Sequence, residues 1–328
     1  MGMMHLPADP RGGCRARGWR HEKQPVVPAV STVIATHGLT KKFREHTAVD
    51  GVDLSVPQGV VYGFLGPNGS GKSTTMKMLL GLSQPTAGEI EIFGQSLTPR
   101  TRGDLLPSIG SMIEAPPGYG HLTGWENMLI VRDMLGLVDA QIRTALEIVR
   151  LSEQKDKLVR NYSLGMKQRL GIAMALARDP SLLVLDEPTN GLDPAGIEEI
   201  RDLLIELAGQ GITVMVSSHL LDEIDKMASV LGILSAGRLI FQGTRADLFA
   251  HSLPDLVIET PSIDAALRAV PYATITGGGI RLSGHDNEAT AALVALLVAA
   301  DVRIHQVRRV QQSLEDVFMD LTGRGGLL

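Results

Sequence analysis

The pattern of apolar positions predicts strands alternating with helices over the first 250 residues. Short apolar runs bounded by turn residues are typical of buried strands in a parallel sheet. Such runs, together with one alternating segment, occur at 33–39, 48–56, 60–65, 182–185, 213–216, 230–234 and 238–242. Helical spacing occurs at 73–82 and 196–207, and the stretch 122–178 is helical in character throughout. This alternation predicts an α/β fold with a helical insert at about 115–178.

The pattern changes after residue 252, where shorter elements predict a second, smaller domain. The expected elements are strand 256–259, helix 263–270, hairpin strands 274–276 and 280–282, helix 288–300, strand 302–307 and helix 314–321. The β-α-β-β-α-β order within them predicts an α+β, ferredoxin-like module. We therefore expect an α/β domain at 32–250 and the small C-terminal module at 253–328.

Residues 1–31 have a composition typical of a disordered extension; an over-called start codon is the other interpretation. Basic residues and prolines are scattered through them, without the apolar core that a signal peptide needs. The only cysteine of the chain, Cys14, lies here, so no disulfide can form within the chain. That is usual for proteins of a reducing compartment.

Charge and hydropathy narrow the class of partner. The chain carries 31 Lys and Arg against 36 Asp and Glu, a formal net charge of −5. A dedicated nucleic-acid binder would carry a basic excess, so we expect no nucleic-acid partner. The longest apolar stretch, 291–300, is too short to span a bilayer, which takes about 20 residues. Any role at a membrane is therefore expected to come through a separate protein.

A glycine-rich motif predicts a phosphate-binding loop between an apolar strand and a helix. Residues 66–73 fit the pattern G-x-x-x-x-G-K-[ST] without mismatch. Glycines allow successive backbone N–H groups to converge on phosphate oxygens, and the helix N-terminus favours an anion. Lys72 is expected to reach the β- and γ-phosphates, and Ser73 to bind Mg²⁺. The expected nucleotide contacts are Gly66, Pro67, Asn68, Gly69, Ser70, Gly71, Lys72, Ser73 and Thr74.

Acidic residues at the end of the run 182–185 predict the catalytic half of this site. Open α/β sheets bind ligands at the carboxyl ends of their strands. Asp186 is expected to bind Mg²⁺ through water, and Glu187 to act as the general base on the attacking water. His219 follows a strand expected to neighbour that of Asp186, where it could hold the water in line. The alternatives are exposed carboxylates without a role and a structural histidine.

Further motifs follow in order and give the chain a family resemblance. They are Tyr-Ser-Leu-Gly-Met-Lys-Gln-Arg at 162–169, Asp-Glu-Pro-Thr at 186–189, Gly-Leu-Asp at 191–193 and the histidine at 219. Together with the phosphate loop, this set resembles the ABC transporter ATPases over roughly 33–248. The resemblance implies the ABC cassette of the P-loop NTPases, a mixed sheet with an antiparallel β part and a helical subdomain.

The resemblance also implies residue roles in a pair of cassettes. In that family the signature segment of one subunit closes over the nucleotide held by the other. Ser163 and Gly165 would hydrogen-bond the γ-phosphate there, at a helix N-terminus. Asp193 matches the loop residue that couples the two sites. Phe43 matches the aromatic that stacks on adenine, and an ordinary core aromatic is the alternative.

Departures from the family pattern narrow the branch. The usual signature is Leu-Ser-Gly-Gly-Gln, and this chain has Tyr162, Leu164 and Met166 in place of three of those residues. Glu114 stands where the family usually has glutamine. A carboxylate there can still bind Mg²⁺, and it adds negative charge beside the phosphates when the metal is absent. With Tyr119 and the segments 122–127 and 313–318, these changes resemble the antibiotic- and bacteriocin-export branch, which includes the bacitracin, lantibiotic and daunorubicin transporters.

These observations predict an ATPase that uses ATP and Mg²⁺ at the cytoplasmic face of the plasma membrane. Its expected partners are a separate transmembrane permease, docked near 114–126, and a second ATP-binding subunit, expected to be an identical copy. One alternative is a soluble ABC ATPase acting on ribosomes or DNA. A single cassette without a heptad run weighs against it. Another is a module that senses ATP with little hydrolysis, against which Glu187 weighs.

Overall fold

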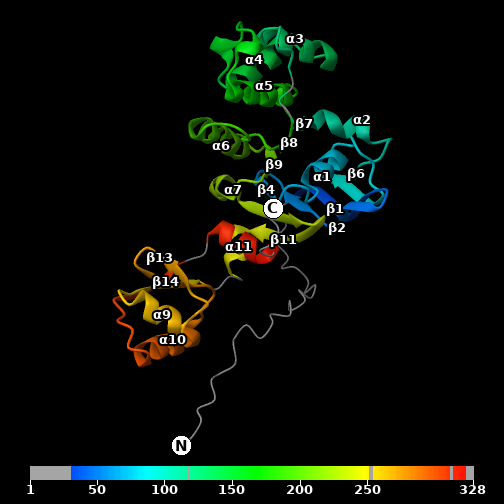
Figure 1. The fold of residues 1–328 in the computed structure, drawn as a ribbon. Coiled ribbons are helices and arrows are strands. Elements are labelled where there is room, and N and C mark those ends of the chain that lie inside the picture. Colours follow the sequence, from blue (N-terminus) through cyan, green and yellow to red (C-terminus); the bar gives the residue numbers. More distant parts are fainter. Residues whose placement is uncertain (1–30, 115, 117, 251–253, 311–312, 323–328) are drawn as a thin grey trace, which may run out of the picture. The chain divides into compact units, whose positions relative to one another are not determined.

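The computed structural model describes residues 31–328 except 115, 117, 251–253, 311–312 and 323–328. The extension expected at 1–31 therefore lies, but for Ser31, outside the described residues. The described part contains three sheets (Figure 1).

The central sheet has six strands in the order β11-β10-β4-β9-β8-β7. Their bounds are β4 Val61–Leu65, β7 Ile109–Met112, β8 Leu182–Asp186, β9 Thr213–Ser218, β10 Val230–Ser235 and β11 Arg238–Thr244. All neighbours are parallel except the β10–β11 hairpin. Five of these strands follow predicted runs, whereas β7 was not predicted.

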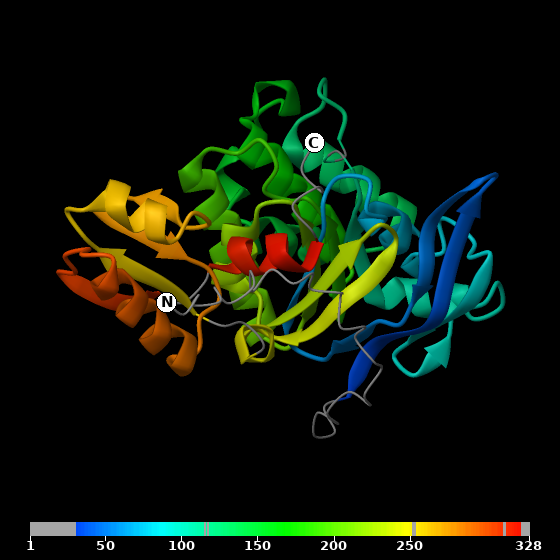
Figure 2. The same ribbon diagram turned by 60° about the horizontal axis from the view of Figure 1, so that its bottom comes forward.

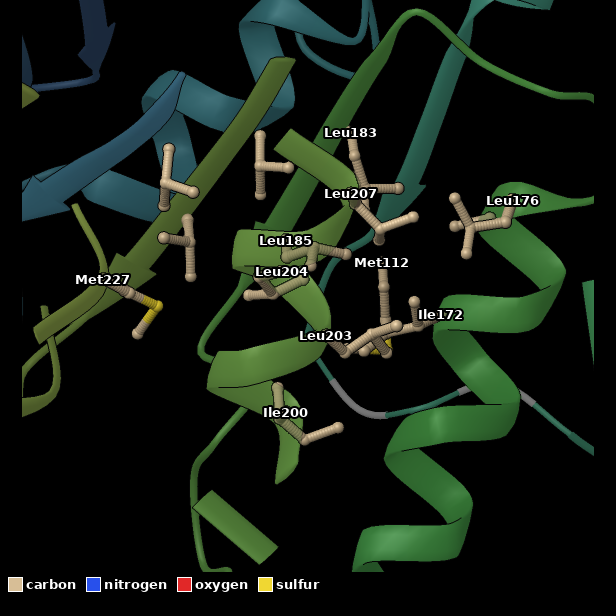
Figure 3. Close-up of a cluster of buried hydrophobic side chains, with 14 of the residues drawn as sticks. Met112, Ile172, Leu176, Leu183, Leu185, Ile200, Leu203, Leu204, Leu207 and Met227 are labelled. Atoms are coloured by element: carbon tan, nitrogen blue, oxygen red, sulfur yellow. The ribbon is translucent and has the colours of Figure 1, made fainter. Parts of the chain in front are cut away.

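Side chains of the central strands alternate between two hydrophobic cores. In β8, Leu183 and Leu185 belong to one core, while Leu182 and Val184 belong to the other. Because successive side chains of a strand point to opposite faces, an all-apolar strand fits only a sheet covered on both sides. Figure 3 shows the first core, in which side chains of α5 (Leu164–Leu176) and α6 (Pro194–Gly209) face the strands.

The second core is covered by an antiparallel sheet and by α1 (Lys72–Leu79). The strands of that sheet are β1 Thr32–Phe43, β2 His46–Val52, β3 Ser55–Pro57, β5 Ala87–Ile92 and β6 Gln95–Ser96. The single strand predicted at 48–56 is in fact two, β2 and β3. At the break the Thr36 hydroxyl donates to Val52 O and accepts from Leu54 N–H, both at 2.8 Å, beside a backbone bond from Thr36 N–H to Leu54 O at 3.0 Å.

The helical insert predicted within 122–178 consists of separate helices joined by short turns. Its α-helices are α3 Gly124–Leu135, α4 Asp139–Ile148 and α5. Gly136, with φ +66°, ends α3, and short 3-10 turns at Ser152–Gln154 and Val159–Asn161 precede α5. Thr123 and Glu126 form a capping box that fixes the start of α3. Outside the insert, the further described α-helices before residue 251 are α2 Arg102–Leu105, α7 Leu221–Met227 and α8 Arg245–Ala250.

The C-terminal elements form a third sheet, β13-β14-β12-β15, with its own core. They are β12 Asp255–Glu259, α9 Ile263–Ala269, β13 Thr274–Thr276, β14 Gly279–Leu282, α10 Asn287–Ala299 and β15 Gln306–Val310. The strand predicted at 302–307 was placed too early, because pairing sets Gln306 opposite Glu259. Val302 instead packs in the module's core.

The last helix, α11 (Leu314–Thr322), packs against α7, and Figure 2 shows it in red. Its buried residues Leu314, Val317 and Phe318 belong to the same core as Met227 of α7. A search of the described residues found no helix with the length and apolar character needed to cross a membrane.

Candidate functional site

The predicted site residues lie at the carboxyl ends of adjacent parallel strands. The phosphate loop follows β4, and His219 follows β9. Asp186 is the last residue of β8, and Glu187 comes directly after it. Since β9 lies between β4 and β8, three motifs far apart in sequence meet at one edge of the sheet. The prediction that the strand before His219 neighbours the strand of Asp186 is confirmed.

Glycine is required in the phosphate loop by close approach of the backbone. Gly71 has φ +106°, and a Cβ placed there would lie 2.4 Å from the carbonyl oxygen of Ala48. A Cβ on Gly66 would lie 2.4 Å from the carbonyl oxygen of Leu234. The loop is also tied to the β10–β11 turn, because the Gly237 N–H donates to Ser70 O at 3.0 Å. The loop is thus a rigid backbone cradle.

Lys72 lies inside this cradle, with its side chain largely buried. Its Nζ donates to Gly66 O at 2.7 Å and to Pro67 O at 3.2 Å. Burial lowers the pKa of Lys72, whereas the negative charges of Glu187 and Asp186 act to raise it. The ammonium group is therefore within electrostatic range of Asp186 at the end of β8 and of Glu187 just after it.

Ser217 organises the carboxylates. Its hydroxyl donates to Asp186 Oδ1 at 2.5 Å and accepts from the Glu187 N–H at 3.0 Å. Glu187 has φ +50°, an uncommon conformation for a non-glycine residue. His219 Nδ1 lies 2.6 Å from Glu187 Oε2. A carboxylate oriented by a histidine in this way can accept a proton from a bound water.

The signature segment and the loop after β8 both end in helix caps. The Ser163 hydroxyl accepts from Met166 N–H at 3.2 Å and caps α5. Asp193 accepts from Gly196 N–H at 3.1 Å and caps α6. A Cβ on Gly165 would meet no atom closer than 3.8 Å. Packing within this chain therefore does not require glycine at 165.

Two predicted residues lie at the margins of the site. Phe43 ends β1 with half of its surface exposed, and Lys41 Nζ lies 5.1 Å from its ring centroid, so it is not a core aromatic. Glu114, with φ +69°, is exposed and bonds to Lys77 Nζ at 2.5 Å. The hydrogen bond and charge of Lys77 lower the pKa of Glu114. Its carboxylate is therefore already paired with α1.

Ser217 and Lys77 were not among the predicted residues. Ser217 could have been found, because the run at 213–216 ends in hydroxyl residues and strand register places Ser217 opposite Asp186. Lys77 follows Ser73 by one helical turn, and no sequence signal connects it to Glu114, 37 residues later.

The described residues fit a triphosphate with Mg²⁺. The first turn of α1 has no side-chain cap, which leaves its N–H groups directed at the loop. The Ser70 hydroxyl is buried and has no protein partner among the described residues. Mg²⁺ normally takes one or two protein oxygens beside phosphates and water, a number that Ser73 and Asp186 supply.

Comparisons with known proteins agree with this geometry. A family model described as ABC transporter matches residues 49–190. The bacitracin transport ATP-binding protein BcrA of Bacillus licheniformis is 40% identical over 305 residues, covering 90% of this chain and 99% of that protein. The daunorubicin/doxorubicin resistance ATP-binding protein DrrA of Streptomyces peucetius is 35% identical over 309 residues, covering 88% and 92%.

Solved structures agree as well. CbiO1 of Clostridium perfringens, described as part of the ABC transporter complex cbiONQ, superposes with a TM-score of 0.62 at 28% identity, covering 67% of this chain and 91% of that one.

The fold and the edge of the central sheet define a P-loop ATPase with an ABC cassette. The chain belongs to the family of ABC transporter ATP-binding proteins, which are ATPases that power transport. The predicted resemblance to the antibiotic-export branch is confirmed by the bacitracin and daunorubicin relatives.

Proposed function

We propose that this chain is the ATP-hydrolysing subunit that drives a separate membrane permease for export of an antibiotic, peptide or other drug-like compound. One observation carries the catalytic part of the proposal. The Glu187 carboxylate lies 2.6 Å from His219 and acts electrostatically on buried Lys72. A base, an orienting histidine and a phosphate-binding lysine therefore share one edge of the sheet.

Each residue of this edge has a distinct task in the proposed reaction. The backbone of the phosphate loop and Lys72 hold the phosphates, which places the γ-phosphate beside β8. Glu187 accepts the proton of the attacking water, and His219 keeps that carboxylate oriented. Ser73 and Asp186 would hold Mg²⁺, which neutralises charge on the β- and γ-phosphates. Ser217 fixes Asp186 for this purpose.

We propose a second, identical cassette as the other half of the site. Ser163 and Gly165 would cap the γ-phosphate of the partner copy, and Asp193 would lie between the two sites. The open space around Gly165 supports this, since no packing within the chain explains a glycine there. Phe43 would stack on adenine, which its exposed ring permits. Glu114 would reach Mg²⁺ only after leaving Lys77.

The proposed location is the cytoplasmic face of the plasma membrane, where the chain associates through its permease. We propose the cassette at 32–250, with its helical insert at about 115–178, and the small module at 253–328, the last helix of which, α11, packs on the cassette core. The proposed substrate class follows the relatives, whose names refer to bacitracin transport and to daunorubicin/doxorubicin resistance.

ATP turnover by the purified chain, alone and with its permease, tests the catalytic proposal. Glu187→Gln should leave ATP affinity intact and lower turnover by on the order of a hundredfold or more, because the amide cannot accept the proton. Lys72→Ala is the contrasting variant, in which nucleotide binding itself should weaken. Near-normal turnover in Glu187→Gln would remove Glu187 from the role of base.

Co-purification tests the permease. A candidate permease expressed together with this chain should co-purify with it from detergent-solubilised membranes and should raise its ATPase rate when substrate is added. Association with ribosomes or DNA in place of a membrane protein would favour the soluble ATPase and contradict the transport proposal.

A further inference from the structure

The signature segment at the start of α5 and the loop before α6 contact each other through leucine side chains. Leu164 Cδ2 lies 3.0 Å from the position that a Cβ on Gly191 would take. In return, Leu192 Cδ2 lies 3.8 Å from the corresponding position on Gly165. Leu164 stands where the family signature usually has glycine. The added side chain therefore contacts the neighbouring loop of the same chain.

A second contact joins the same two helices further along their length. Arg169 of α5 forms an ion pair with Glu199 of α6. Each residue comes six positions after the N-cap of its helix, Ser163 or Asp193. At 1.5 Å per residue, the pair lies about 9 Å along each axis from the capping residue. The ion pair therefore lies at the same distance along each helix from its N-cap.

The environment of Arg169 makes this pair more than a surface contact. Its side chain is 15% exposed, whereas that of Glu199 is 55% exposed. Burial, followed by the positive charge of Arg150, lowers the pKa of Arg169. A cation with so little access to water depends on its acidic partner. Glu199 is therefore expected to bind Arg169 persistently.

We propose that Arg169 and Glu199 are positioning residues that lock α5 to α6, so that Ser163 and Asp193 approach a second cassette as one unit. Apolar contacts between the helices, such as those around Leu203 and Ile172 in Figure 3, are not directional. An ion pair about 9 Å from the loop contact fixes the angle between the helices as well. This inference rests on the proposed function, because only paired cassettes use both loops at one site.

Charge exchange tests the proposal. Glu199→Arg, Arg169→Glu and the double exchange are compared with the unaltered chain in ATP turnover. The same changes in a Glu187→Gln background are followed by sedimentation with Mg-ATP. Glu199→Arg should lower kcat about tenfold or more and weaken association, since small misplacement of reacting groups is costly. The Kd of the isolated chain for a fluorescent ATP analogue should change less than about twofold, because Lys72 is untouched. The double exchange should recover most of the loss.

Glu198→Arg is the matched control. Glu198 neighbours Glu199 and pairs with Arg201 within α6. Glu198→Arg therefore changes the net charge by as much as Glu199→Arg does, but it breaks no ion pair between two helices. If Glu199→Arg lowers the unfolding midpoint, Glu199→Gln replaces it in these assays. Wild-type turnover and association in folded Glu199→Arg and Glu199→Gln would overturn the inference, as would a folded exchange variant that stays impaired. If the unaltered chain neither hydrolyses ATP nor associates, the proposed function fails as well.

Discussion

At the scale of single residues, the phosphate loop shows how backbone approach dictates side-chain identity. Gly71→Ala should destabilise the protein by about 2 kcal/mol or more, since a β-carbon adds strain at φ +106° and lies 2.4 Å from Ala48 O. Gly69→Ala is the matched control, with φ +78° and open space around the added atom. Urea unfolding should show the larger loss for Gly71→Ala, and equal losses would contradict a close-contact role.

The site residues predicted from the sequence lie in local motifs, whereas Ser217 and Lys77, which act through tertiary contacts, were not predicted. The phosphate loop, Asp186 and Glu187 follow from spacing alone, because each motif contains its own turn or strand end. Ser217 comes 31 residues after Asp186, and its hydroxyl bonds to Asp186 from the neighbouring strand. Lys77 bonds to Glu114, which follows β7. Strand β7 pairs with β8 and was not among the strands predicted from the sequence.

At the scale of elements, α11 belongs to the core of the cassette although it follows the small C-terminal sheet. Phe318→Ala should cost about 3–5 kcal/mol, because the ring is buried in the core that also contains Met227 of α7. Glu315→Ala on the exposed face of the same helix should change the free energy of unfolding by less than about 0.5 kcal/mol. Similar unfolding midpoints for the two variants would show that α11 does not pack on the cassette.

Periodicity predicted α11 but not its partner. Residues 314, 317 and 318 have the spacing of one buried helix face, and that spacing fits the C-terminal module as well as the cassette. The same limit explains β2 and β3. Their alternation is continuous along the chain, and the bonds at the break between them are made with β1, among them those of the Thr36 hydroxyl. Element type is thus encoded locally, whereas breaks and partners depend on tertiary contacts.

At the scale of the whole molecule, the proposed reaction requires two cassettes to meet. Ser163 and Asp193 cap their own helices, and within the described part of the chain neither bonds to the phosphate loop. Glu187→Gln with Mg-ATP should therefore sediment at twice 35.1 kDa, because bound ATP persists and joins the copies. Since a second copy stabilises the folded state by mass action, Tm in Mg-ATP should also rise with protein concentration. Adding Lys72→Ala should abolish both effects by removing the nucleotide. A mass that stays at 35.1 kDa throughout would leave the signature segment without a nucleotide to contact.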